Sequence, residues 1–194
     1  MRATLTLRAA AWIVDLIIVL VILFFIGLIY KPDISGLVSA MDLITVSYAE
    51  GSISFSDYIL SLSEYYKKMD EANIVLNVIN VIVLLGYFVF LPYFNNGKTL
   101  GKMFNKIEVK AQSNQELAFW QLLFRNLIIN GLFYLIMVIF CTLIIPSEIY
   151  FVIITCLGII QIILILISVL MVIYRKDRKA LHDMFSKTWV ACSK

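Results

Sequence analysis

The chain has 194 residues, of which 62% are hydrophobic and only 15% are charged, and its formal net charge is +3. Soluble domains contain about 45–50% apolar and about 25% charged residues, so this composition excludes an ordinary soluble protein and indicates one all-α membrane domain. Three cysteines and one histidine predict neither a disulfide framework nor a zinc site, and we expect no metal, no cofactor and no nucleic-acid partner.

The first apolar segment, 9–30, is uncharged except for Asp15. About 20 such residues suffice for a helix to cross the hydrocarbon core of a bilayer. A carboxylate inside a span costs about 2.5–3.5 kcal/mol on insertion and usually faces protein or water. Arg8 lies on the same helix face, but helical side chains lean toward the N-terminus, so Arg8 leans away from Asp15. We therefore expect Asp15 to find its partner on another helix.

Three further segments, 72–94, 126–146 and 149–174, are also long and apolar enough to span a bilayer. The sequence thus predicts a polytopic membrane protein with four transmembrane helices. The connection 31–71 is polar, with helical spacing of its apolar residues, and we expect a helical insertion there.

Basic residues indicate the orientation of these spans. Two arginines lie at the N-terminus, five basic residues lie between the second and third spans, and six follow the fourth span, whereas the insertion 31–71 carries three lysines and seven acidic residues. Cytoplasmic connections are enriched in lysine and arginine. We predict a multi-pass protein of a plasma membrane with both termini in the cytoplasm and with the insertion outside.

Two short amphipathic helices are predicted on the cytoplasmic side, at about 98–107 and about 179–187. In the first, the apolar residues recur at helical spacing, while Lys98, Lys102 and Lys106 share the opposite face. Such a helix lies in the membrane interface with its lysines toward anionic headgroups.

Residues 97–109 align without gaps on residues 178–190, with six identities. The two pairs of predicted spans have similar lengths as well. We therefore predict a duplicated unit: two tandem hairpins, each followed by an interfacial helix.

Amide side chains recur in the later spans, at Asn126, Asn130 and Gln161. Hydrogen bonds between transmembrane helices explain such residues most simply. The alternative is that they line a polar path.

The sequence resembles the RDD family of bacterial membrane proteins in the stretches LRAAAWIVD (7–15), GKTLGKMFNKIEV (97–109) and RKALHDMFSKTWV (178–190), and in the pair Arg125-Asn126. The family is named for one arginine and two aspartates. The resemblance makes Arg8 and Asp15 the arginine and the first aspartate and Asp183 the second. It covers nearly the whole chain as one domain and implies transport of ligands not yet identified; some members look like monovalent cation/proton antiporters.

Two hypotheses for function follow. In the first, the protein is an ion-coupled transporter or a component of one, in which Asp15 exchanges a proton for a monovalent cation. Arg8, Arg125, His182 and Asp183 then form a charged vestibule, and four spans require a homo-oligomer or a larger assembly. In the second, the same charges form a structural network in a regulatory or scaffold subunit that binds a membrane protein partner. An enzyme is not expected, because His182 is the only histidine and no nucleophile–base pair can be assigned.

Overall fold

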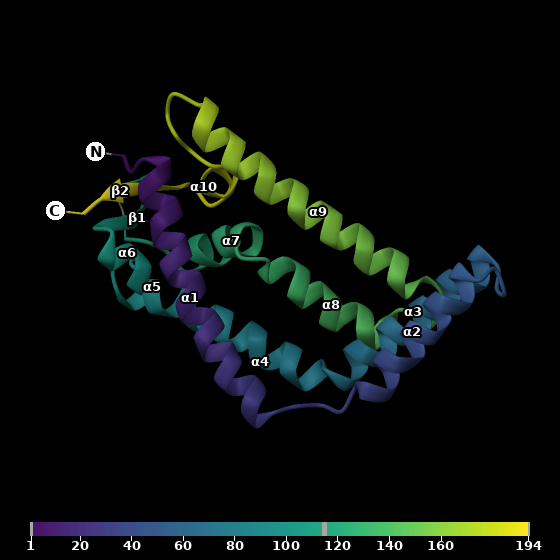
Figure 1. Ribbon diagram of the computed structural model, residues 1–194. Helices are drawn as coiled ribbons and strands as arrows, with labels where there is room; N and C mark the ends of the chain where they lie inside the picture. Colours follow the sequence, from purple (N-terminus) through teal and green to yellow (C-terminus); the bar gives the residue numbers. More distant parts are fainter. Residues whose placement is uncertain (1, 114–115, 194) are drawn as a thin grey trace.

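The computed structural model describes residues 2–113 and 116–193. Over these residues the chain is mainly helical, with one two-stranded sheet close to both termini (Figure 1). We call this end of the molecule the terminal end. In chain order, the elements are α1 (Leu5–Ile29), α2 (Ser35–Ala49), α3 (Phe55–Ala72), α4 (Ile74–Leu85), the π-helix η1 (Gly86–Phe90), α5 (Leu91–Phe94), α6 (Leu100–Phe104), β1 (Ile107–Ala111), α7 (Phe119–Ile129), α8 (Leu132–Ile144), α9 (Ser147–Tyr174), α10 (Leu181–Phe185) and β2 (Thr188–Cys192).

Three helical stretches are long and apolar enough to cross a membrane: α1, the stretch Ile74–Phe94 that contains α4, η1 and α5, and α9. Helices α7 and α8 qualify only as a pair, and they meet at an angle of 79°. The described part of the chain therefore holds three candidate spans, or four if the bent pair is one span, which fits a multi-pass membrane protein. The continuous helix predicted at 126–146 is wrong: α7 begins at Phe119, and the helix breaks between Asn130 and Leu132.

Gly131 explains the break between α7 and α8. Its φ of +68° lies in the left-handed region, which favours glycine because other residues carry a clashing Cβ. The carbonyl of Ile128, in the last turn of α7, accepts a hydrogen bond of 2.5 Å from Gln161 Nε2 on α9. Gln161 of α9 thus supplies a hydrogen-bond donor to a carbonyl at the end of α7, where the last carbonyl groups of a helix have no donor within the helix.

Pro92 explains the π-helix in the second candidate span. Proline has no N–H, so the carbonyl of Phe88 four residues earlier loses its usual helical donor. The helix widens here, and the N–H of Leu91 bonds to the carbonyl of Gly86. The amide of Asn126 on α7 donates to the Phe88 carbonyl at 2.7 Å. This bond fastens α7 to the second span.

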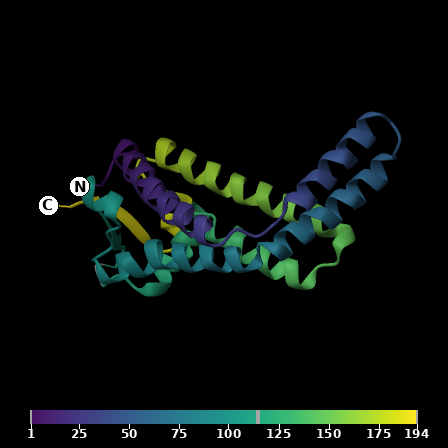
Figure 2. The ribbon, with the colours of Figure 1, turned by 60° about the horizontal axis from the view of Figure 1, so that its bottom comes forward.

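Helices α2 and α3 form a hairpin that projects from the opposite end of the molecule (Figure 2). Helix α3 packs against α8 and α9: the Ser63 hydroxyl accepts from the N–H of Phe151 at 2.8 Å, and Lys67 donates to the carbonyl of Ile145 at 2.8 Å. Helix α2 buries no residue. The insertion expected at 31–71 therefore consists largely of two helices, of which α3 carries the contacts to the spans.

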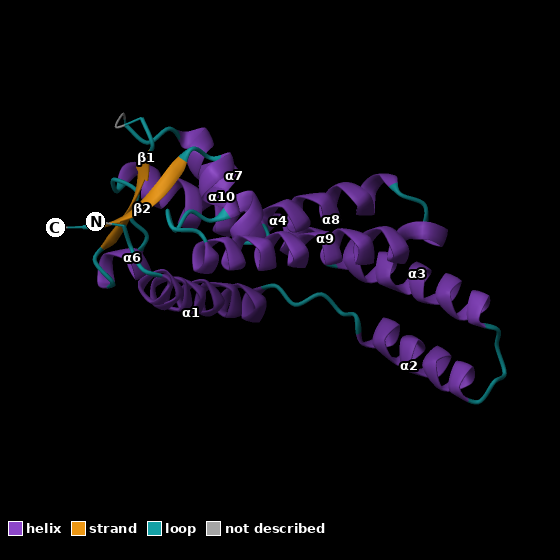
Figure 3. Ribbon diagram, turned by 90° about the horizontal axis from the view of Figure 1, so that it is seen from above, coloured by secondary structure: helices purple, strands orange, loops and turns teal. Residues whose placement is uncertain are grey.

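At the terminal end, β1 and β2 pair antiparallel, with Val109 opposite Val190 (Figure 3). The interfacial helices predicted at about 98–107 and about 179–187 are shorter than expected, because α6 and α10 each stop after five residues, and the strands follow at Ile107 and Thr188. Lys106 and Lys187 follow the two helices with φ of +50° and +51°, a left-handed turn that ends each helix and redirects the chain into a strand. In β1 the buried residues Ile107, Val109 and Ala111 alternate with Glu108 and Lys110, which is the period of a strand, and the prediction missed this change from the helical period.

The two copies of this helix–strand unit match in position. An offset of 81 residues separates the starts of the helices, Leu100 and Leu181, and also the starts of the strands, Ile107 and Thr188. The gapless alignment of 97–109 on 178–190 therefore corresponds to a repeated local fold.

Candidate functional site

The carboxylate of Asp183, on α10, joins three separate segments of the chain. Its side chain is fully buried. It accepts a hydrogen bond of 2.7 Å from Arg8 Nη1 on α1, a second from Arg125 Nη1 on α7, and a third from its own helix at the N–H of Ala180. Burial raises the pKa of Asp183, but the guanidinium groups of Arg125 and Arg8 outweigh burial and hold it well below its usual range.

Asp15, on α1, is also buried, yet its partners are neutral. Tyr87 Oη donates to Oδ1 at 2.6 Å, the N–H of Gly101 donates to the same oxygen at 2.7 Å, and Thr99 Oγ1 donates to Oδ2 at 2.6 Å. Thr99 is also the N-cap of α6. Asp15 thus binds other segments and not Arg8, as the lean of Arg8 away from it predicts. The donors are two hydroxyl groups and one backbone amide, and none of them carries a positive charge.

Gly101 makes the contact between α1 and α6 possible. A Cβ atom at this position would lie 2.2 Å from the carbonyl oxygen of Ala11 and 2.8 Å from the carboxylate of Asp15. Only glycine permits this approach, and the approach brings the Gly101 N–H to Asp15.

A cavity of about 530 Å³ lies between α1, α7 and α9. This volume falls in the range of about 300–1,000 Å³ that is typical of ligand sites. Most of its wall is apolar, and its ionisable side chains gather near the terminal end. They are Arg8, Asp15, Lys102, Arg125 and His182. The predicted charge network is therefore assembled at one site, with Asp183 bound to its two arginines.

Lys102 lines this cavity, and this placement corrects the prediction that it faces headgroups. Burial, together with the positive charge of Arg125, lowers the pKa of Lys102 to about 7. Lys98 likewise turns to the protein and pairs with Glu108 at 3.3 Å, whereas Lys106 is exposed. The physical reason is that β1 follows α6 directly, so α6 packs against α1 and does not lie free in the interface.

His182 is buried beside this cluster, and its Nδ1 lies 2.6 Å from the hydroxyl of Ser168 on α9. Burial, followed by the positive charge of Arg125, lowers the pKa of His182 to about 3. The imidazole is therefore neutral at physiological pH. Its 3.6 Å approach to Asp183 is not an ion pair.

The amide side chains predicted as polar lining divide into two groups. Asn126 and Asn130 line the cavity and bond to each other at 2.6 Å, and Asn130 also accepts from the indole N–H of Trp12 at 3.2 Å. Gln161 is outside the cavity wall and bonds to the end of α7. For Gln161, the geometry therefore favours a hydrogen bond between helices over a place in a polar path.

Arg8, Asp15 and Asp183, the arginine and the two aspartates of the resemblance, lie at the terminal end. A comparison with models of protein families identifies the same family. The family model described as RDD family matches residues 2–187. The chain belongs to the RDD family. No curated protein and no solved structure matches it.

In this RDD protein, sequence reasoning overlooked three residues that hold the charged site: Tyr87, Thr99 and Gly101. Tyr87 lies in an apolar run, where a tyrosine has no distinctive signal. Thr99, by contrast, directly precedes an apolar helical pattern, which is the position of an N-cap. The cap could have been predicted from the sequence, but its bond to Asp15 could not.

Proposed function

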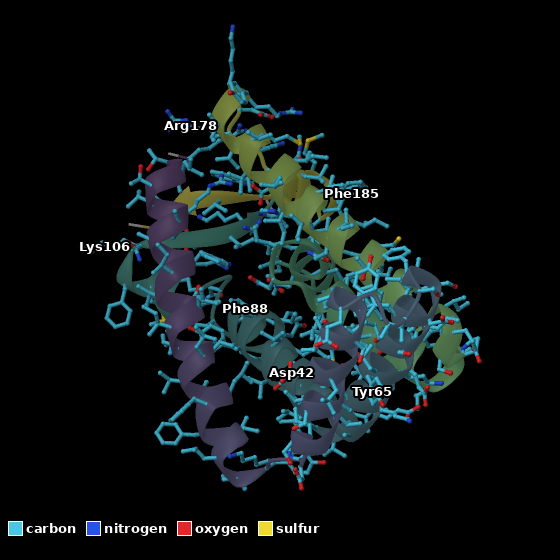
Figure 4. All side chains as sticks on the ribbon, turned by 45° about the vertical axis from the view of Figure 1, so that its right-hand side comes forward. Asp42, Tyr65, Phe88, Lys106, Arg178 and Phe185 are labelled. Carbon is cyan, nitrogen blue, oxygen red and sulfur yellow. The ribbon has the colours of Figure 1, made fainter. Side chains whose placement is uncertain are left out.

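We propose that this RDD protein is a transporter, or a component of one, in the plasma membrane of a bacterium, with the terminal end in the cytoplasm. The distribution of charge supports this orientation. Lys106 and Arg178 lie toward the terminal end, and Asp42 and Tyr65 lie toward the opposite end (Figure 4). The basic connections are thus gathered on one side of the apolar helices and the acidic hairpin on the other.

The observation that carries the proposal is the charged cavity among apolar helices. Ionisable groups inside membrane segments are costly and mark paths for ions or substrates. Here three cations, Arg8, Lys102 and Arg125, meet in a space large enough for a ligand. A purely structural network would not need a cavity of this size.

Exchange of a proton for a monovalent cation is the specific activity to test first. Asp15 is the carboxylate that we expected to carry the exchange, but its oxygens already accept three hydrogen bonds. A bare cation would have to displace these donors. Lys102 offers another proton-exchanging group, because its pKa of about 7 lets it gain and lose a proton near neutral pH. We infer that Lys102 is the coupling residue and that Asp15 positions α6, which carries it.

Reconstituted vesicles test this proposal directly. Purified protein is placed in liposomes with a pH-sensitive dye inside, and sodium or potassium is added outside. We expect proton efflux from the wild type, loss of flux in Lys102→Gln, and unchanged flux in Lys106→Gln, which alters an exposed lysine near the same helix. Equal flux in wild-type, Lys102→Gln and empty vesicles would remove the proposal.

A regulatory or scaffold subunit is the second candidate, and one observation favours it. The two aspartates use their oxygens to fasten α6 and α10 to the spans, as a structural network does. Asp15→Asn keeps the shape of the side chain but removes its charge, and both candidates expect it to loosen α6 and lower accumulation in membranes. Lys102→Gln distinguishes the candidates. In a transporter this variant should accumulate and lose the flux of the wild type, whereas in a scaffold neither the wild type nor the variant should show flux.

A further inference from the structure

The cationic groups in the cavity include donors that the protein itself leaves unsatisfied. Among the described residues, Arg8 Nε and Nη2 are buried and have no hydrogen-bond partner, although Nη1 bonds to Asp183. Lys102 is half-buried, and its amino group has no hydrogen-bond or ion-pair partner within the part of the chain that the structure describes. A buried donor without an acceptor costs about 1–3 kcal/mol, and more when it is charged. These groups are arranged for acceptor oxygens that come from outside the chain.

The charge of the site selects an anion. Asp183 is already bound by two arginines, and Asp15 by three neutral donors. Protonated Lys102 therefore adds a positive charge that no carboxylate in the cluster pairs with. An oxyanion placed between Arg8 and Lys102 would accept from both, in charge-assisted hydrogen bonds.

The rest of the cavity wall is mostly apolar, apart from Asn126, Asn130 and Ser168, and the cavity is open at the side. Trp12 on α1 and Val169 on α9 both line the cavity, yet they are 43% and 39% exposed. Helices α1 and α9 diverge on either side of α7 (Figure 1). The cavity thus reaches the surface between two helices that are themselves apolar, on the face where a bilayer would lie.

We propose that this cavity binds an anionic membrane lipid, with its charged headgroup against Arg8 and Lys102 and its acyl chain passing between Trp12 and Val169 into the bilayer. The inference rests on the proposed function, because it assigns a ligand class to the same cavity. A free phosphate ion would use the two cations but not the apolar wall or the side opening. An uncharged lipid would use the wall but leave the cations unsatisfied.

Lipid retention measures this binding without reference to transport. The protein is purified from nanodiscs that contain equal amounts of phosphatidylglycerol and phosphatidylcholine, and the retained lipid is counted by native mass spectrometry. We expect about one phosphatidylglycerol per chain. Lys102→Gln should lower its retention about tenfold, as the loss of one charge-assisted hydrogen bond implies. Lys106→Gln is the matched control and should retain as much as the wild type.

A second variant tests the position of the acyl chain. Val169→Trp places a large side chain in the side opening and should displace the lipid, whereas Val152→Trp, at an exposed position of α9 outside the cavity wall, should not. Equal retention of the two lipids, retention that neither Lys102→Gln nor Val169→Trp lowers, or displacement by millimolar phosphate would each overturn the inference. Selective retention without ion flux would support the lipid site and overturn the transport proposal. Flux without selective retention would do the reverse.

Discussion

Val109 and Val190 face each other across the two strands, and they are also equivalent residues of the repeated helix–strand unit. The two copies therefore meet at matching positions, and both side chains are buried, at 2% and 1% exposure. A sheet built in this way joins the two halves of the chain at the terminal end. It holds α6 and α10, and thus Lys102 and Asp183, at the same end of the cavity.

Cross-linking tests the pairing of the strands. Lys110 and Trp189 are register partners, and the Cβ atoms of directly opposed residues lie about 4.5–5.5 Å apart. In a chain whose three native cysteines are replaced by serine, Lys110→Cys with Trp189→Cys should form a disulfide under mild oxidation, seen as a mobility shift on gels. Lys110→Cys with Met184→Cys is the control and should remain reduced. Equal cross-linking of both pairs would contradict this register.

Loss of the buried carboxylate should destabilise the protein strongly. Asp183→Asn leaves two buried guanidinium groups without a counter-charge, and breaking a buried ion pair from one side costs about 3–5 kcal/mol. Thermal unfolding in detergent measures the effect. Asp177→Asn removes a carboxylate that pairs with Arg175 at the surface, so its cost should stay below about 1 kcal/mol. Similar melting temperatures for both variants would argue against a central role for Asp183.

Gly101 should not tolerate even a methyl group. Gly101→Ala places a Cβ against the carbonyl of Ala11 and the carboxylate of Asp15, and overpacking of this kind costs about 1–3 kcal/mol. Gly27→Ala, within α1, meets no atom within 4 Å and should be neutral or slightly stabilising. The melting temperatures of the two variants give the comparison. A stable Gly101→Ala protein would mean that α6 lies farther from α1.

Stability should fall in mild acid because of His182. The unfolded chain binds a proton at the ordinary histidine pKa of about 6.5, whereas the folded protein, with its pKa of about 3, does not. Between these values the unfolded state holds more protons, so the free energy of unfolding decreases as the pH falls from 6.5. The lowered pKa of Asp183 also decreases the free energy of unfolding in acid, but only below the ordinary aspartate pKa of about 3.9, where the unfolded chain begins to bind this proton.

The measurement is the melting temperature between pH 7 and pH 5. His182 faces Arg125, Asp183 and Arg8, whose charges do not change over this range, and Lys102, whose pKa of about 7 confines its own titration to the upper end of the range. His182→Gln keeps a polar side chain near Ser168 but removes the titration. The variant should therefore show a flatter pH dependence than the wild type. An identical slope would assign the acid sensitivity to another group.

Several features of this protein follow from the sequence alone. Long apolar runs determine the membrane class and place three candidate spans, because a helix that crosses a bilayer needs about 20 apolar residues wherever it lies in the chain. The position of Asp15 inside such a run predicts that its carboxylate is buried and has a polar partner. The repeat at 97–109 and 178–190 is likewise visible as a local pattern, and each copy folds into the same short helix.

Only the tertiary structure decides which groups meet. The strands could not be predicted, because five residues of alternating character are stable as a strand only when a partner from elsewhere in the chain pairs with them. The break at Gly131 is held by Gln161 on another helix. Arg8, near the N-terminus, binds Asp183, near the C-terminus. Lys102 lines the cavity because α6, which is followed by β1, packs against α1. The charges were evident from the sequence, but their partners depend on contacts between distant segments, which no local pattern records.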